Sequence, residues 1–208
     1  TGSVNANLDV TEWFNIVYRL GLDTYAYDEY TYIAPGGAVS DRYQNGRLSK
    51  SDRNYQYLSS NLMLNFHKTF GDFDFNLLLG QTSEDTKNIR QNHWGYDFVT
   101  AGTISFANIA NENKFFTEAT TNKRLIGVYG EFRAAYKNIA YLTITGRNDW
   151  SSTLPIENRS YFYPSVSGSL VFTELMPKND ILSFGKIRAS WAQVGNDASA
   201  YATNTYMW

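Results

Sequence analysis

Apolar and polar residues alternate with a period of two along most of the chain. Such runs begin near residues 14, 58, 73, 126, 166 and 187. One run sets the apolar residues Ile126, Val128, Phe132 and Ala134 against the polar residues Lys123, Tyr129, Glu131 and Arg133. Successive side chains of a β-strand point to opposite faces, so this pattern predicts strands with one apolar and one polar face. Each run is about ten residues or longer, which approaches what a tilted strand needs to cross a bilayer.

The connections between these runs are alternately short and long. Residues 69–72 and 136–139 are typical of tight turns, whereas about 25–52, 83–122 and 149–160 are long polar stretches. An up-and-down barrel in a membrane has one rim of short turns and one of long loops, while a soluble sandwich does not require that asymmetry. The sequence therefore predicts an all-β fold, an antiparallel up-and-down transmembrane β-barrel.

The polar face of the predicted strands carries charged and amide side chains that suit a water-filled or plugged lumen. They are Arg19, Asp23, Asn61, Asn65, Glu131, Arg133 and Arg188. Tyr and Trp gather near strand ends, as in the aromatic girdles at the two membrane interfaces. The predicted girdle residues are Trp13, Tyr18, Tyr55, Tyr57, Tyr136, Tyr161 and Tyr163. The alternative is that these strands form one sheet of a soluble β-protein.

Composition narrows the functional classes. The chain has 208 residues, of which 16% are aromatic and 18% charged, and its mean hydropathy is −0.41. No run of about 18 apolar residues occurs, which excludes a transmembrane helix. A net charge of −2 with scattered basic residues gives no basis for binding nucleic acid. Without Cys and with only His67 and His93, we expect no disulfide, no metal site and no cofactor.

The start of the chain has no pattern of a secretory signal. If the protein is exported, we expect the signal to have been removed or to lie outside this segment.

Two groups of residues are candidates for contact with a substrate or a partner. Arg147, Asp149 and Trp150 place a guanidinium, a carboxylate and an indole near a strand end, where they can bind a sugar. The alternative is an ion pair within the strand-end network, with Trp150 anchored at the membrane interface. The second group, Trp94, Tyr96 and Asp97, lies in the longest predicted loop and either contacts a ligand or packs the loop onto itself.

The sequence contains no catalytic constellation of nucleophile, base and orienting group, so we predict that the protein is not an enzyme.

Two sequence blocks stand out in the C-terminal third of the chain, the first made of residues 145–155 and 158–167 and the second of residues 182–197. Residues 145–155 read Thr-Gly-Arg-Asn-Asp-Trp-Ser-Ser-Thr-Leu-Pro, and residues 158–167 read Asn-Arg-Ser-Tyr-Phe-Tyr-Pro-Ser-Val-Ser. Residues 182–197 read Leu-Ser-Phe-Gly-Lys-Ile-Arg-Ala-Ser-Trp-Ala-Gln-Val-Gly-Asn-Asp. Both blocks resemble the SusC/RagA family of TonB-dependent outer-membrane receptors. The resemblance covers the C-terminal third closely, whereas the N-terminal two thirds are similar only in pattern.

The resemblance implies a large barrel of about 22 strands in the bacterial outer membrane, with an N-terminal plug folded inside it. It also implies import of oligosaccharides or peptides, driven through TonB, together with a SusD-like surface lipoprotein. The chain offers only about eight or nine strands, with no plug-like segment and no TonB box. We therefore predict that residues 1–208 are part of the receptor barrel, with 201–208 the start of a further strand.

Two other interpretations remain open from the sequence. The chain could be a complete small barrel of about eight strands that serves as a membrane anchor or in adhesion. It could also be a soluble carbohydrate-binding β-domain whose aromatic residues form a sugar platform.

Overall fold

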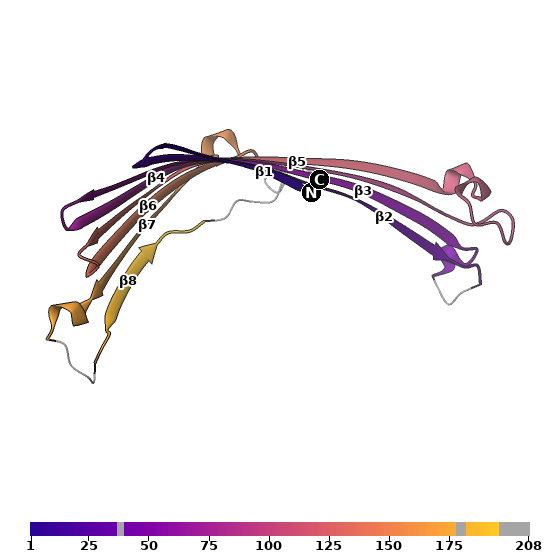
Figure 1. Cartoon of the computed structure of the whole chain (residues 1–208). Helices are drawn as coiled ribbons and strands as arrows, with labels where there is room; N and C mark the ends of the chain where they lie inside the picture. Colours follow the sequence, from indigo (N-terminus) through magenta and orange to yellow (C-terminus); the bar gives the residue numbers. More distant parts are fainter. Residues whose placement is uncertain (37–39, 178–181, 196–208) are drawn as a thin grey trace. The chain divides into compact units, whose positions relative to one another are not determined.

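Eight antiparallel strands in one sheet make up the fold. The computed structural model describes residues 1–36, 40–177 and 182–195. The strands are β1 (Gly2–Thr11), β2 (Phe14–Ile33), β3 (Arg47–Phe70), β4 (Phe73–Tyr96), β5 (Lys114–Tyr136), β6 (Ala140–Ser151), β7 (Ser160–Val171) and β8 (Lys186–Ala192). Each strand pairs with its neighbours in chain order, as Figure 1 shows for β6, β7 and β8. The predicted all-β, up-and-down class is confirmed.

Short 3₁₀ turns interrupt the connections between the strands. They are η1 (Asp41–Tyr43), η2 (Phe106–Asn108), η3 (Asn111–Asn113), η4 (Ile156–Asn158) and η5 (Phe172–Leu175). Among the described residues, no helix has the length and apolar character needed to span a membrane.

The chain divides into two compact units, which are described separately. The first unit consists of residues 1–22, 58–85 and the described part of 123–208, and the second consists of residues 23–57 and 86–122. The first unit contains β1, β6, β7, β8 and the adjoining ends of β2 to β5. The second contains the remaining ends of β2 to β5 and the loops that join them.

The strand register in the first unit places apolar and polar side chains on opposite faces. Ile144 of β6 lies between Phe132 of β5 and Val166 of β7. Three residues further along β6, on the opposite face, Arg147 lies between Tyr129 and Tyr163. The alternation predicted from the sequence is therefore confirmed in this part of the sheet.

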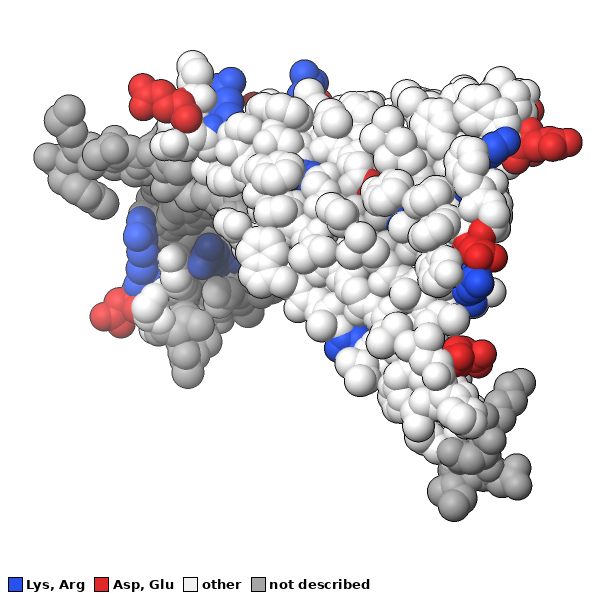
Figure 2. All heavy atoms as spheres, turned by 90° about the vertical axis from the view of Figure 1, so that its left-hand side faces the viewer, with Lys and Arg blue, Asp and Glu red and all other residues white. Residues whose placement is uncertain are grey.

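The apolar face of the first unit is left exposed. Its large exposed side chains include Val128, Phe132, Leu142, Ile144, Val166, Leu170 and Trp191. Most of the surface seen in Figure 2 carries no charged side chain, and the charged side chains in view gather near its edges. Soluble proteins rarely expose so continuous an apolar surface, whereas lipid covers such a face in a membrane barrel.

Aromatic side chains stack on the apolar face near the short turns of the first unit. Phe14 and Phe66 have ring centroids 4.7 Å apart, with Trp13 beside them. The Phe73 and Tyr136 centroids are 4.8 Å apart. The girdle interpretation fits the positions of Trp13 and Tyr136, which are both exposed.

The girdle prediction is wrong for Tyr161 and Tyr163. The β7 register pairs them with Asp149 and Arg147, so they lie on the polar face. Their aromatic type suggested a membrane interface, but strand parity decides which face a residue occupies.

Two predicted tight turns are confirmed and lie next to each other. Gly71 joins β3 to β4 with φ 58°, and Lys137 and Asn138 join β5 to β6 with φ 49° and 59°. Two consecutive positive φ angles are typical of the hairpin turn whose twist matches the flanking strands. The Lys137 N–H donates to the carbonyl of Asp72 at 3.0 Å, and its ammonium lies 3.0 Å from the Asp72 carboxylate.

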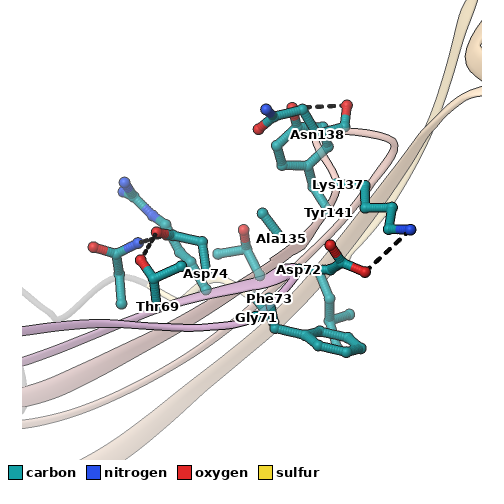
Figure 3. Close-up of a pocket in the computed structure, with 14 residues that line it drawn as sticks. Thr69, Gly71, Asp72, Phe73, Asp74, Ala135, Lys137, Asn138 and Tyr141 are labelled. Carbon is teal, nitrogen blue, oxygen red and sulfur yellow. Dashed lines mark hydrogen bonds and ion pairs between the residues drawn. The ribbon is translucent and has the colours of Figure 1, made fainter.

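Figure 3 shows this ion pair beside a pocket of about 560 Å³ that the two turns border. The neighbouring carboxylate of Asp72 raises the pKa of Lys137 and keeps its ammonium charged. The pocket contains none of the predicted site residues.

The predicted bounds of the long loops are wrong. Strands β2 and β3 continue to Ile33 and from Arg47, while β4 and β5 continue to Tyr96 and from Lys114. Much of 25–52 and 83–122 is therefore strand, and the connections shrink to 34–46 and 97–113. The sequence concealed this because polar residues occur on both faces of these extensions, so the regular apolar alternation stops while backbone pairing continues.

Two further comparisons with the sequence-based predictions concern the ends of the chain. Strand β1, Gly2–Thr11, was not identified from the sequence, although Val4, Ala6 and Leu8 alternate with Asn5, Asn7 and Asp9. The predicted final strand at 201–208 lies outside the described residues.

A charge placed on the apolar face should destabilise the barrel far more than one on the polar face. In the full-length protein we expect Ile144→Lys to lower the free energy of unfolding by about 2–4 kcal/mol if position 144 lies near the bilayer centre. Thr143→Lys, on the opposite face of the same strand, is the matched control and should change it little. Urea unfolding in lipid vesicles measures both, and equal losses would contradict the face assignment.

Candidate functional site

The predicted site residues separate into two places, one in each unit. The second unit holds an arginine–aromatic cluster, which comprises Arg42, Tyr43, Arg47, Trp94, Tyr96 and Phe115. The first unit holds the ion pair of Arg147 and Asp149. Each place lies beside a pocket on a polar sheet face.

Stacked rings form the base of the arginine–aromatic cluster. Trp94 and Tyr96 are two residues apart on β4, so they share one face of the strand. Phe115 of β5 stacks on Trp94 with a centroid distance of 4.1 Å and lies 6.0 Å from Tyr96. Tyr43 of η1 meets Tyr96 edge-on at 6.0 Å. The pairing of β4 with β5 therefore assembles rings that are distant in sequence.

Two guanidinium groups lie over these rings. Arg42 is 4.7 Å from the centroid of Tyr96 and 5.7 Å from that of Trp94. Arg47 is 5.0 Å from the centroid of Tyr43 and 5.4 Å from that of Trp94. A cation over an aromatic face is attracted by the ring quadrupole, which leaves the edge of the guanidinium plane available for hydrogen bonds. Arg42 also donates to the Tyr96 hydroxyl at 3.3 Å, which raises the pKa of Arg42.

A polar pocket of about 490 Å³, here called the arginine pocket, adjoins this cluster. Its lining comprises Glu29, Thr31, Arg47, Ser49, Ser51, Arg90, Asn92, Trp94 and Thr117. Hydrogen bonds cross its floor around Asn92. The Asn92 amide oxygen accepts from Ser51 at 2.7 Å and from Nε of Arg90 at 3.2 Å, while its Nδ2 donates to Thr117 at 3.3 Å. The pocket thus offers donors from four neighbouring strands, β2 to β5.

Asp97 lies apart from the rings, in a turn. It has a positive φ of 62°, and its N–H donates to the carbonyl of Gly46 at 3.1 Å. Its carboxylate accepts from the Asn113 amide at 3.4 Å. The first bond ties loop 97–113 to loop 34–46, and the second joins the two ends of loop 97–113. Both favour a loop-packing role for Asp97 over ligand contact.

In the first unit, Arg147 and Asp149 form an ion pair on the polar face of β6. Nε of Arg147 donates to Oδ2 of Asp149 at 2.9 Å, and Asp149 is 9% exposed. A terminal nitrogen of Arg147 donates to Thr82 at 3.0 Å. The guanidinium lies 5.5 Å from the ring of Tyr129, whose hydroxyl donates to Asn61 at 3.0 Å. A continuous polar network therefore crosses β6, β5, β4 and β3.

Two glycines make room for this network. A Cβ on Gly127 would collide with the carboxylate of Asp149 and the guanidinium of Arg147. A Cβ on Gly80 would collide with the ring of Tyr129. Glycine at these strand positions lets bulky neighbours lie directly on the backbone.

The ion pair borders a pocket of about 340 Å³, lined by Leu125, Arg147, Asp149, Tyr161, Tyr163, Val194 and Gly195. Trp150, the third residue of the predicted group, lies on the opposite face of β6 and is 42% exposed. The structure therefore keeps Arg147 with Asp149 but separates Trp150 from both. Its position suits the alternative of an indole at the membrane interface.

The residues that complete the arginine–aromatic cluster and the Arg147–Asp149 network were not predicted from the sequence. Arg42 and Arg47 join Trp94 only because loop 34–46 and β3 fold against β4, and nothing in their spacing indicates it. Tyr129 and Thr82 reach Arg147 across strands. Among the described residues, no group of three His, Asp or Glu side chains is placed to hold a metal ion.

Comparison with known proteins gives one relative in sequence and several in structure. No family model matches the chain. It is 26% identical over 175 residues to the TonB-dependent receptor P26 of Formosa agariphila, a match that covers 80% of this chain and 16% of that receptor. Solved structures of the RagAB peptide transporter and of the RagAB peptide importer in a closed-closed state each match with a TM-score of 0.86. At 16% identity, both matches cover 98% of this chain and 23% of the other.

The fold is that of a stretch of β-barrel wall, as in the RagAB structures. The resemblance to SusC/RagA TonB-dependent receptors, seen in residues 145–167 and 182–197, is confirmed by these two comparisons. The chain spans less than a quarter of each similar protein. Those proteins are a receptor and a transporter rather than enzymes.

Gly127 should be essential to the geometry of the ion pair. We expect Gly127→Ala in the full-length receptor to lower the free energy of unfolding by about 1–3 kcal/mol, because the added methyl group displaces Arg147 and Asp149. Gly168→Ala is the matched control, since its nearest contact would be a carbonyl oxygen at an ordinary 3.8 Å. Urea unfolding compares them, and equal stability of the two variants would show that the polar network tolerates displacement.

Proposed function

We propose that the protein containing this segment imports nutrients across the bacterial outer membrane as a SusC-like, TonB-dependent transporter. The observation that carries the proposal is the two-faced sheet, with exposed apolar residues such as Ile144 on one side and the Arg147–Asp149 network on the other. A wall between lipid and a polar lumen needs this arrangement. The similarity to a TonB-dependent receptor and to the RagAB transporter supports the same function.

The cargo in this proposal is an oligosaccharide or a peptide. Both have polar groups that exchange water for side-chain donors such as those of Arg47, Ser51 and Asn92. Several weak polar contacts suit transport because a cargo must be held and then released. The RagAB structures are described as those of a peptide transporter, which favours a peptide, while the pocket chemistry serves either class.

The proposed mechanism divides the work between the wall and other parts of the receptor. Ion pairs and hydrogen bonds on the polar face, such as the network from Arg147 to Asn61, hold the wall rigid while the cargo passes. The energy comes from the inner-membrane proton-motive force through TonB, which acts on a plug outside this segment. A SusD-like surface lipoprotein delivers the cargo. The segment itself performs no chemical conversion in this proposal.

The two other interpretations are less well supported. A soluble carbohydrate-binding domain would leave Phe132, Ile144 and Val166 in water as part of a large apolar face. A small complete barrel requires the sheet to close, yet within the described residues β1 pairs only with β2 and β8 only with β7.

Uptake measured in cells tests the proposed function. We expect cells with the full-length receptor to accumulate a fluorescent oligosaccharide or peptide from a mixed library, and to lose this accumulation when TonB is deleted or a protonophore is added. Binding of the same compound to the purified receptor should persist, because only translocation needs energy. Accumulation that continues unchanged without TonB would contradict the proposal.

A further inference from the structure

In the second unit, positive charge is concentrated on the sheet face that bears Trp94. Arg47 and Arg90 line the arginine pocket, and Arg42 lies over the adjoining rings. The only acidic residue in the pocket lining is Glu29. Within the described part of the chain, none of these three guanidinium groups forms an ion pair. The pocket therefore carries a net positive charge that its own residues leave uncompensated.

Lys50 provides an internal contrast. It is adjacent in β3 to the pocket residues Ser49 and Ser51, so its side chain points to the opposite face. There its ammonium pairs with Asp52 at 2.9 Å. The chain thus neutralises a cation on one face of β3 and leaves Arg47 without a counterion on the other.

The guanidinium of Arg47 is held by aromatic rings and not by a carboxylate. Its plane lies against Tyr43 and Trp94, and its Nε is buried without a hydrogen-bond partner. A buried donor without an acceptor is costly, so proteins rarely keep one unless water, an ion or a ligand satisfies it. Arg90 donates through Nε to Asn92, and no acceptor for its terminal nitrogens is found among the described residues.

We propose that the arginine pocket binds a carboxylate group of the transported cargo, a proposal that rests on the import function above. Arg47 and Arg90 donate to the two carboxylate oxygens, since a planar guanidinium matches a carboxylate in geometry and charge. Ser49, Ser51 and Thr117 offer hydroxyl groups to the rest of the ligand. A volume of about 490 Å³ accommodates one uronic acid or one acidic amino-acid residue with its neighbouring bonds. The pocket thus selects cargo by charge.

Calorimetric binding to the detergent-purified full-length receptor tests this proposal. Two probe pairs differ mainly in side-chain charge: tetragalacturonate against its methyl ester, and tetraglutamate against tetraglutamine, with both peptides acetylated at the N-terminus and amidated at the C-terminus. We expect the charged member of one pair to bind at least tenfold more tightly than its neutral partner, and that pair identifies the cargo as saccharide or peptide. The double variant R47Q/R90Q should abolish this preference, and added salt should weaken it.

Lys50→Gln is the matched control, because it removes one positive charge from the same strand on the opposite face. It should leave the charge preference unchanged. Heat-modifiable migration in gels verifies that each variant folds as a barrel, and the exposed Arg90 allows R90Q to be tested alone if R47Q does not fold. Equal affinity for both members of both pairs, or an undiminished preference in R90Q and the double variant, would overturn the proposal.

The two proposals can fail separately. TonB-dependent uptake of neutral compounds alone would keep the import function and remove the carboxylate site. A charge preference in the purified receptor without TonB-dependent uptake would do the reverse.

Discussion

Side-chain alternation along hydrogen-bonded strands is the constraint on which the rest of this structure depends. Backbone N–H and C=O groups within a bilayer must find partners in neighbouring strands, because lipid offers none. Once the strands are paired, each side chain points either to lipid or to the interior. The position of a residue along its strand decides which of the two it faces. Ile144 and Arg147 lie three residues apart and belong to different environments for this reason alone. Among the described residues, only Leu48, Ile109 and Val171 are buried apolar side chains, so the sheet does not depend on an ordinary core.

On the polar face, charged groups must be kept ordered beside water. In the first unit Arg147 is satisfied by Asp149 and Thr82, and Gly127 provides the space. In the second unit the guanidinium groups of Arg42 and Arg47 are held by aromatic rings instead of carboxylates. In the first arrangement a carboxylate neutralises the guanidinium, whereas in the second the two guanidinium groups have no carboxylate partner among the described residues. This difference is why we assign a structural role to the first place and ligand recognition to the second.

The sequence predicted the structure well where strands have one apolar face, and poorly in the polar extensions of the strands. Strand type, face assignment and the turns at Gly71 and Lys137 were predicted, because lipid imposes a strict alternation and the turns are short. The extensions of β2 to β5 were not, because strands that carry polar residues on both faces lose that signal. Trp94 and Tyr96 were singled out for their residue type, but their partner Arg47 comes from another strand. Contacts across strands follow from register, which no local pattern in this sequence specifies.

The accessibility of single cysteines tests the two-faced wall most directly, and the 208 residues contain no native Cys to interfere. In a cysteine-free full-length receptor in outer membranes, each position from 141 to 145 would be replaced in turn and exposed to a membrane-impermeant maleimide. We expect labelling at 141, 143 and 145, which face the polar interior, and protection at 142 and 144, which face lipid. Equal labelling of neighbouring positions, or labelling confined to 142 and 144, would contradict a barrel wall between lipid and a polar lumen.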